Sequence, residues 1–303
     1  MITRTWSKVR TGIRLLNHEM RVSKARRLVT QGTNHLTNGD LEGALRYAKR
    51  ALSAYFDFND AFHLMAEALM PGDDYIALLS RFHNWLRPAG YVEIGVSRGE
   101  SLALTRSSTN AVGIDPNPRI EKRISSRTRL YPVTSDEFFD TYDLLDELGV
   151  SRLGLAFIDG LHRFEHVLKD LMNVERYSDS ATVILVHDCL PVAKVLATRT
   201  PVTDLWCGDV WKIVPCLKKY RPDLSVRVVP TRPSGLAIIT NLNPHSTILH
   251  HKLEEIVREY KEIELDYEYL DLHERSLKKM VPMLIANDWI AITRGLSSTS
   301  SVL

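Results

Sequence analysis

Short apolar runs alternate with longer helical stretches through the middle of the chain. Strand-length apolar runs stand at 91–94, 111–114, about 129–133, 153–158 and 182–186. The stretches between them suit crossover helices, which indicates parallel strands joined by right-handed connections. Two later runs, Ser225–Val229 and Leu236–Thr240, are separated only by Pro230–Gly235, too short for a crossover helix, so they should pair antiparallel. We therefore expect an α/β fold with a doubly wound, seven-stranded, mostly parallel sheet that ends in an antiparallel hairpin.

Both ends of the chain have helical periodicity instead. Small and apolar residues recur at helical spacing within 41–52, and 59–69 follows as a second helix. Pro71–Asp74 breaks this pattern and can cap a helix over Tyr75–Leu86. The expected organisation has four parts: a helical N-terminal extension at 1–74, the sheet domain at 75–243, C-terminal helices at 244–295 and a disordered tail at 296–303.

Composition narrows the class of protein without naming its chemistry. The 303 residues are 44% hydrophobic and 25% charged, as in soluble globular proteins, and the net charge of +2 gives no electrostatic case for a nucleic-acid partner. The basic N-terminus is interpreted as a solvated helix face rather than an RNA or membrane contact. No apolar run is long enough to span a membrane, and no secretory signal is visible. The three cysteines show no paired framework, which favours a reducing cytoplasm.

The segment Tyr91–Glu100 carries the first chemical signal. A predicted strand reaches Glu93, glycines follow at Gly95 and Gly99, and the next predicted strand ends at Asp115. Strand, glycine turn, helix, strand and acidic residue is the layout of a nucleotide-type cofactor site. The dinucleotide fingerprint needs further glycines at 97 and 100, where this chain has Ser and Glu. The pattern therefore argues against a nicotinamide-dependent oxidoreductase, which stays the alternative enzyme class.

The spacing Glu93-x-Gly95-x-x-x-Gly99 resembles motif I of class I S-adenosylmethionine (SAM) methyltransferases, whose sheet is Rossmann-like. The resemblance implies that the methionine part of SAM lies over Glu93–Gly99 and that Asp115 holds the ribose. It also implies an adenine-side loop after the third strand, where Ser135 is the expected contact. The competing interpretation is that the glycines serve only turn geometry and that Asp115 caps a helix.

Two polar clusters follow the fourth and fifth predicted strands. Asp159-Gly-Leu-His162 follows one, and His187-Asp188-Cys189 follows the other. Carboxyl ends of neighbouring parallel strands line the same crevice, so these side chains should converge. Over residues 75–240 the combination resembles small-molecule O-methyltransferases of the macrocin and mycinamicin sugar type. That resemblance implies methylation of a hydroxyl on a small molecule or carbohydrate.

The same residues suggest roles in catalysis. Methyl transfer to a hydroxyl needs a base, and His187 or His162 suits that task near neutral pH. The resemblance implies a divalent cation, Mg²⁺ or another, held by Asp159 and Asp188, with Asp159 also bordering the cofactor. Cys189 stands where a further oxygen ligand is usual and suits a hard cation poorly, so His162 or water is the candidate replacement. Alternatively, the histidine–aspartate pairs are structural and Asp159 caps a helix near Leu161, while His166 is interpreted as a surface residue.

Two segments outside these clusters carry further expectations. Asp209 should cap a helix running to Tyr220, and Trp206 with Trp211 could form an aromatic wall for the acceptor or pack in the core. The helical pair at 41–69 resembles one tetratricopeptide unit, which makes the N-terminus a candidate surface for a protein partner or a second copy of this chain. A catalytically inactive methyltransferase-like scaffold is the non-enzyme alternative.

Overall fold

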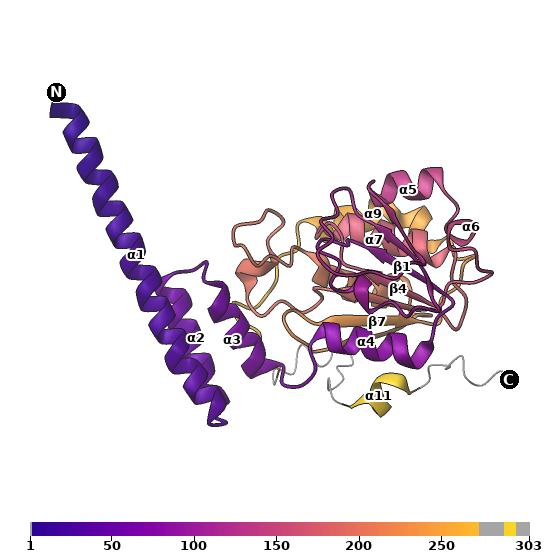
Figure 1. The fold of residues 1–303 in the computed structure, drawn as a ribbon, viewed down its shortest axis with the longest axis horizontal. Coiled ribbons are helices and arrows are strands. Elements are labelled where there is room, and N and C mark those ends of the chain that lie inside the picture. The colour runs from indigo at the N-terminus through magenta and orange to yellow at the C-terminus, as the bar shows by residue number, and fades with distance from the viewer. Residues whose placement is uncertain (1, 273–287, 295–303) are drawn as a thin grey trace.

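The computed structural model describes residues 2–272 and 288–294. Seven strands form one sheet in the order β3-β2-β1-β4-β5-β7-β6 (Figure 1). The strands are β1 (Gly90–Ile94), β2 (Asn110–Ile114), β3 (Thr128–Tyr131), β4 (Leu155–Ile158), β5 (Val183–His187), β6 (Ser225–Val229) and β7 (Leu236–Thr240). The first five are parallel, and β7 is antiparallel to both β5 and β6. The expected doubly wound sheet with a terminal hairpin is confirmed.

Strand limits differ from the prediction where local chemistry stops the ladder. β3 ends at Tyr131 instead of continuing to 133, because Pro132 has no N–H to donate to a neighbouring strand. β4 begins at Leu155 instead of 153. The expected tail at 296–303 lies outside the described residues.

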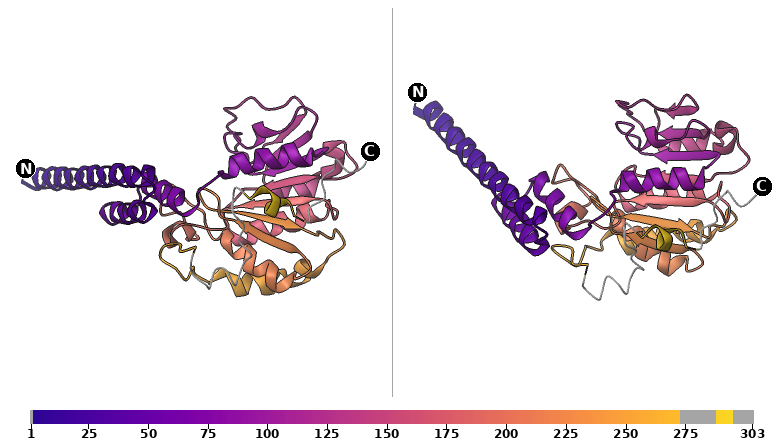
Figure 2. Two further views of the ribbon diagram at one scale, coloured as in Figure 1. Left: turned by 90° about the horizontal axis from the view of Figure 1, so that it is seen from below. Right: turned by 60° about the horizontal axis from the view of Figure 1, so that its bottom comes forward.

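Alternate residues of each strand point to opposite faces of the sheet, and both faces are buried. Val92, Val112, Ala156 and Ile184 belong to one core, and their sequence neighbours, such as Tyr91 and Leu155, belong to the other. The helices over the first face are α5 (Ser135–Thr141), α6 (Leu144–Leu148), α7 (Phe164–Glu175), α8 (Ile213–Tyr220) and α9 (Ile248–Lys261). The second face is covered by α4 (Tyr75–Leu86), capped by Asp74 as expected, and by α11 (Trp289–Thr293) (Figure 2). Burial on both faces is typical of parallel sheets with crossover helices.

Chain order places a crevice beside β1. From β1 the chain runs outward to β2 and β3, then returns to the other side of β1 as β4. The connections on the two sides of β1 therefore diverge, and a ligand fits at the carboxyl ends of these strands. Glycine, acidic and histidine positions from the sequence all fall at this edge.

The N-terminal helices form a separate lobe. α1 (Ile2–Thr37) extends away from the sheet and packs on α2 (Leu41–Ala54), which α3 (Asn59–Leu69) joins to the sheet domain (Figure 1). Ala44, Ala48 and Ala51 of α2 are fully buried. Their small side chains allow the helix axes to approach closely. No helix among residues 2–272 and 288–294 is both long and apolar enough to cross a membrane.

Candidate functional site

A cavity of about 760 Å³ opens at the carboxyl ends of β1, β2 and β4. Its wall includes the glycine loop from Gly95 to Ser101, the end of β2 at Asp115, the start of α5 at Ser135 and the loop from Asp159 to His162. One space therefore joins the segments that the sequence assigned separately to cofactor and acceptor. Its volume lies within the range usual for small-molecule and cofactor sites.

The glycine loop needs glycine at both expected positions. Gly95 has a φ of +86°, and a Cβ there would stand 2.0 Å from the carbonyl oxygen of Asp159. Gly99 has a φ of +77°, a conformation that L side chains rarely adopt. The Asp159 N–H donates to the Ile94 carbonyl at 2.8 Å, so the glycine loop and the loop after β4 lie directly against each other. A larger residue at Gly95 would separate them.

Asp115 braces this loop from the end of β2. Its Oδ2 accepts from the N–H groups of Val96 and Ser97 at 2.9 and 2.8 Å, and its Oδ1 accepts from Asn117 at 2.7 Å. These bonds are not those of a helix cap, which was the alternative interpretation. Asp115 also lines the cavity, where a carboxylate is available to hydroxyl donors.

Glu93 lies beneath the loop and not among the described residues that line the cavity. Its carboxylate accepts from the hydroxyls of Tyr91 and Ser101, each at 2.6 Å. Burial raises the pKa of Glu93 to about 8, although both hydroxyls favour its charged form. Glu93 therefore reaches the cavity through Ser101, which does line it, rather than by its own oxygens.

The loop after β3, which was expected on the adenine side, leads into α5. Thr134 caps this helix in a reciprocal bond with Glu137, which leaves Ser135 in the first turn, facing the cavity. Two residues of α7, His166 and Asp170, line the cavity beside it. His166 is half-buried there, and its interpretation as a surface residue stays a prediction. His166 and Asp170 are one helical turn apart and share a face, a spacing that could have directed attention to them.

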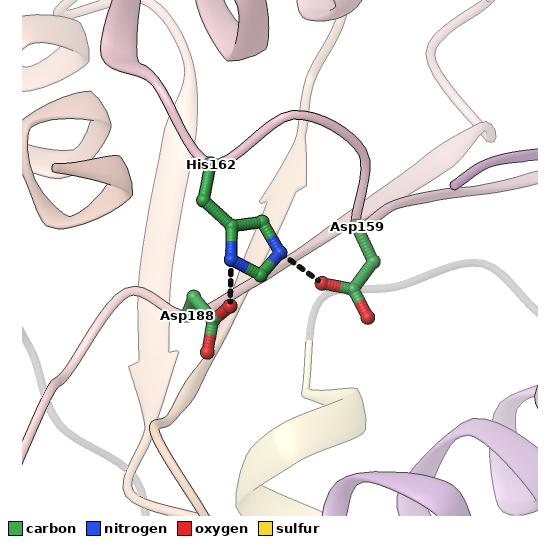
Figure 3. Close-up of side chains that lie close together, drawn as sticks. All are labelled: Asp159, His162 and Asp188. Atoms are coloured by element: carbon green, nitrogen blue, oxygen red, sulfur yellow. Dashed lines mark ion pairs between the residues drawn. The ribbon is translucent and has the colours of Figure 1, made fainter. Parts of the chain in front are cut away.

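The expected convergence after β4 and β5 is present. His162 lies between two carboxylates, with Nε2 3.3 Å from Asp159 Oδ1 and Nδ1 3.2 Å from Asp188 Oδ2 (Figure 3). His187 Nδ1 is 3.2 Å from the same Asp159 oxygen. Asp159 does not cap a helix, because α7 begins only at Phe164. The four residues named from the sequence form one cluster.

The two histidines differ in access to the cavity. His162 lines it, whereas His187 is buried, and the ring of Tyr75 stacks on it with centroids 4.1 Å apart. Tyr75 itself lines the cavity. His187 Nε2 has no hydrogen-bond partner among the described residues. The geometry places His162 towards a ligand and His187 behind Asp159.

Electrostatics couples these groups strongly. Burial alone would lower the pKa of His162, but Asp188 and Asp159 outweigh it and raise that pKa to about 10. The pKa of His187 is also raised, with burial opposed by Asp159 and Asp188. The pKa of Asp159 is lowered because the two histidines overcome the effect of its burial. Both histidines therefore favour their charged form, as neighbouring opposite charges dictate.

Asp159, His162 and Asp188 offer ligand atoms that all lie within 4.8 Å of one another. Two carboxylates and an imidazole suit a divalent cation with mixed oxygen and nitrogen preference. Cys189 is turned away, since its Sγ donates to the Val186 carbonyl at 3.2 Å, so it does not join this set. Asp188 has a φ of +60° and accepts a hydrogen bond from Ser234. Its oxygens are thus held in place from the β6–β7 connection.

The segment 206–209 clamps the His162 loop. The Trp206 carbonyl accepts from His162 Nδ1 at 2.8 Å, and Asp209 N–H donates to the His162 carbonyl at 3.2 Å. Asp209 was expected to cap the helix that runs to Tyr220. Its Oδ1 instead accepts from the N–H of Phe164 at 2.7 Å, at the start of α7. Buried Lys212 and half-buried Arg199 neutralise Asp209, at 2.9 and 2.5 Å from its Oδ2. A hydrogen bond from Phe164, distant in the sequence, therefore overrides the local capping signal.

The two tryptophans have different positions. The Trp206 ring lies 5.5 Å from that of His162, beside the site. Trp211 instead packs against the hydrophobic core. Of the two tryptophans, only Trp206 is therefore placed to form an aromatic wall beside His162.

The turn between α2 and α3 reaches the same clamp. Asp57 Oδ1 accepts from the N–H of Asp204 at 3.0 Å, and Asn59 Oδ1 accepts from Leu205 at 3.2 Å. The next residue is Trp206, whose carbonyl holds His162. The N-terminal lobe therefore supports the His162 side of the cavity through two hydrogen bonds.

One family model and several solved structures resemble parts of this chain. A family described as "Methyltransferase domain" matches residues 92–189. Cofactor-bound Rv0187 from MTB is 16% identical, covers 60% of this chain and 88% of its own, and has a TM-score of 0.45. The O-methyltransferase TomG from Streptomyces achromogenes, solved with SAM, is 17% identical, with coverages of 66% and 89% and a TM-score of 0.44.

The O-methyltransferase from Bacillus cereus in complex with SAH is 12% identical, with coverages of 66% and 90% and a TM-score of 0.41. No curated protein matches the sequence. The family match spans β1 to Cys189, and thus includes the glycine loop, Asp115 and the whole Asp–His cluster. Together with the strand order, this match supports a methyltransferase fold of class I for the sheet domain.

Proposed function

We propose that this protein is a SAM-dependent methyltransferase that methylates a hydroxyl of a small molecule or carbohydrate. The observation that carries the proposal is the single cavity, which has the glycine loop and Asp115 on one side and Asp159 with His162 on the other. A donor bound on the first side would present its methyl group to an acceptor held at the second. Positioning of this kind is the main contribution that an enzyme makes to an in-line displacement.

The cofactor would be held mainly by the glycine loop and the strand ends. Gly95 lines the cavity and would let the methionine part approach the backbone. Gly99 is not among the described lining residues and would serve the turn of the loop through its positive φ, with Glu93 supporting the loop from below. Asp115 is assigned to the ribose hydroxyls, Ser135 to the adenine side and Asp159 to the border with the acceptor. The sheet domain at 75–243 would contain these contacts, with the helices at 1–74 and 244–295 as supports.

The acceptor oxygen attacks the methyl carbon while the carbon–sulfur bond breaks, so the sulfonium becomes a thioether and the hydroxyl proton must leave. We assign the proton to His162, because it lines the cavity and His187 does not. Asp159 and Asp188 stabilise the imidazolium that results, and they also make the neutral ring the minor form near neutral pH. His187 holds Asp159 in position.

Asp159, His162 and Asp188 would be the ligands of a divalent cation. When bound, such an ion would acidify the acceptor hydroxyl. His162 would then act as a ligand, and the two carboxylates would face the metal instead of the imidazole. Turnover measured with Mg²⁺, with Mn²⁺ and after chelation distinguishes the two arrangements, since a histidine base alone needs no added ion.

Calorimetric titration with SAM, S-adenosylhomocysteine and NAD tests the class of cofactor. The proposal requires SAM and S-adenosylhomocysteine to bind and NAD not to bind. Binding of NAD alone would indicate an oxidoreductase, and binding of none of the three would indicate a scaffold. A methyl-transfer screen over hydroxylated sugars and phenols then tests the acceptor class, and transfer only to amines or thiols would refute it.

A further inference from the structure

Helix α1 carries apolar residues on two different faces. In its second half, Ala25 and Leu28 are buried, and a Cβ at Gly32 would stand 2.5 Å from the side chain of Leu64, so this face packs on α2 and α3. In the first half, apolar residues recur at alternating intervals of four and three, and we call these positions the apolar stripe: Ile2, Trp6, Val9, Ile13, Leu16 and Met20. At about 100° per residue, the centres of the two faces lie roughly 120° apart around the helix. The packing of the N-terminal lobe therefore does not use the apolar stripe.

The contacts of the lobe reach α1 only as far as the end of α2. The ring of His18 lies 5.2 Å from that of Tyr55, and Arg21 Nε donates to the Ala54 carbonyl at 2.8 Å. From there α1 runs on past α2 and away from the sheet (Figures 1 and 2). Met20, at this end of the apolar stripe, is 64% exposed, and Lys24 beside it is exposed as well. The stripe thus starts at an exposed residue and continues along the part of α1 that extends beyond the lobe.

The charge of the chain is concentrated on the same helix. Residues 2–27 contain eight basic residues and one acidic residue, Glu19, a net charge of +7, so the rest of the chain carries −5. Between positions 2 and 21 every basic residue falls off the apolar stripe: Arg4, Lys8, Arg10, Arg14 and Arg21. Leu15 is the one apolar residue of this stretch outside the stripe. A narrow apolar face with cations around it is typical of a helix that lies in the plane of a membrane interface.

Charge and apolar pattern together select among the possible partners. A second copy of this chain, paired through the stripe, would bring two segments of +7 side by side, which repel each other. A nucleic acid is held by cations alone and has no use for an apolar stripe. A lipid surface with anionic headgroups uses both features, and Trp6 at the border of the stripe suits the headgroup level, where indole rings concentrate.

We propose that the first half of α1 binds an anionic lipid surface, with the apolar stripe towards the acyl chains and the basic residues towards the headgroups. Such binding would hold the protein at the surface without any segment crossing the bilayer. The inference uses no residue of the cavity, so it stands or falls independently of the proposed function.

Co-sedimentation of the full chain with vesicles tests the charge requirement. Vesicles of phosphatidylcholine with phosphatidylserine should bind at least ~30-fold more tightly than phosphatidylcholine alone, because each cation near an anionic surface contributes about 1 kcal/mol. High salt should remove most of this preference, since it screens the cations. Equal affinity for the two kinds of vesicle, or binding to neither, would overturn the proposal.

Two adjacent leucines test the apolar stripe. Leu16→Asn places an amide on the stripe and should weaken binding to anionic vesicles about tenfold, because a buried leucine is exchanged for a polar group. Leu15→Asn is the matched control, because it makes the same exchange one residue away, off the stripe, with the same charge. It should change the affinity by less than about threefold. Equal losses in the two variants would show that the stripe does not face the lipid.

The remaining measurements address the other partners. Arg10→Gln with Arg14→Gln should weaken binding to anionic vesicles about 30-fold and leave binding to phosphatidylcholine unchanged. Sedimentation velocity without vesicles should show no association that Leu16→Asn abolishes, since such association would assign the stripe to a second copy of this chain. Titration with single-stranded RNA should give weaker binding than anionic vesicles do. Tighter binding of RNA, with Leu16→Asn and Leu15→Asn alike, would assign the basic residues to nucleic acid and overturn the proposal.

Discussion

The glycine loop and the Asp–His cluster meet in one cavity, but they are held by different kinds of contact. The loop depends on backbone geometry at Gly95 and Gly99 and on one carboxylate, Asp115, within a span of about 25 residues. The cluster depends on side chains and carbonyls from the ends of β4 and β5, from 206–209, from Ser234 and indirectly from the α2–α3 turn. The side proposed for the cofactor is therefore held by contacts local in the sequence, and the side proposed for catalysis by contacts distributed along the chain.

The largest effects are expected from substitutions that change only one side of the cavity at a time. His162→Ala should lower methyl transfer by about 10²- to 10⁴-fold, the usual contribution of a general base, while leaving the affinity for S-adenosylhomocysteine within about threefold. Asp115→Ala should weaken that affinity by ~10- to 100-fold, because loop N–H groups and ribose hydroxyls lose their acceptor. Calorimetry and an assay of methyl transfer measure both.

His187→Ala sharpens the same test. It should impair turnover less than His162→Ala, since His187 contacts Asp159 but does not line the cavity. A larger loss for His187→Ala would assign the base to His187. Equal loss of cofactor affinity in His162→Ala and Asp115→Ala would mean that the two sides are not separable.

Gly95→Ala should damage both sides, because Gly95 is the point where they touch. The new Cβ would meet the Asp159 carbonyl at 2.0 Å, in addition to the strain of the positive φ, so we expect a loss of at least ~3 kcal/mol in the free energy of unfolding. Gly149→Ala is the control: its φ is +63°, but its nearest neighbour atom is 4.0 Å away, so strain alone should cost about 1 kcal/mol. Chemical denaturation compares them, and equal losses would show that the close approach is unimportant.

Removing the two hydrogen bonds from the N-terminal lobe should have a smaller effect on turnover, and it should act only on the His162 side of the cavity. The double substitution Asp57→Ala with Asn59→Ala leaves the N–H groups of Asp204 and Leu205 without acceptors and loosens Trp206, the residue that holds His162. We expect turnover to fall about tenfold with unchanged cofactor affinity, as for misplaced catalytic groups. Asp60→Ala, on the exposed side of the same turn, should be neutral. Weaker cofactor binding in the double variant would show that the N-terminal lobe also supports the glycine-loop side of the cavity.

Glu93→Gln should have the smallest effect on activity, but it should clearly change how the free energy of unfolding depends on pH. Its folded pKa of about 8 is above its ordinary value of 4.5, so its contribution to stability is present below pH 4.5 and is lost as the pH rises through 8. Over that window the wild-type protein should lose on the order of 4 kcal/mol that Glu93→Gln does not lose. Denaturation at pH 5 and pH 8.5 measures the difference. Parallel curves for the two proteins would show that Glu93 is charged when buried.

Much of the fold could be predicted because its signals are local. Apolar runs, the short Pro230–Gly235 connection and the cap at Asp74 report strands, a hairpin and a helix start from neighbouring residues. Capping failed as a guide at Asp209, whose carboxylate accepts a hydrogen bond from Phe164, which is distant in the sequence. That His166 lines the cavity was not visible in the sequence, because helical spacing does not say which face of α7 meets the cavity.

The sequence by itself determined the strands and their terminal hairpin, the two glycine positions of the loop after the first strand, and the acidic and histidine residues at the strand ends. These follow from sterics and periodicity within short segments. Only the tertiary structure decided that His162 faces the cavity while His187 lies behind Tyr75, that Glu93 is beneath the loop, and that Asp170 completes the far wall. Those outcomes depend on which helix face packs against the sheet and on hydrogen bonds between residues far apart in the chain, and short-range patterns do not encode either.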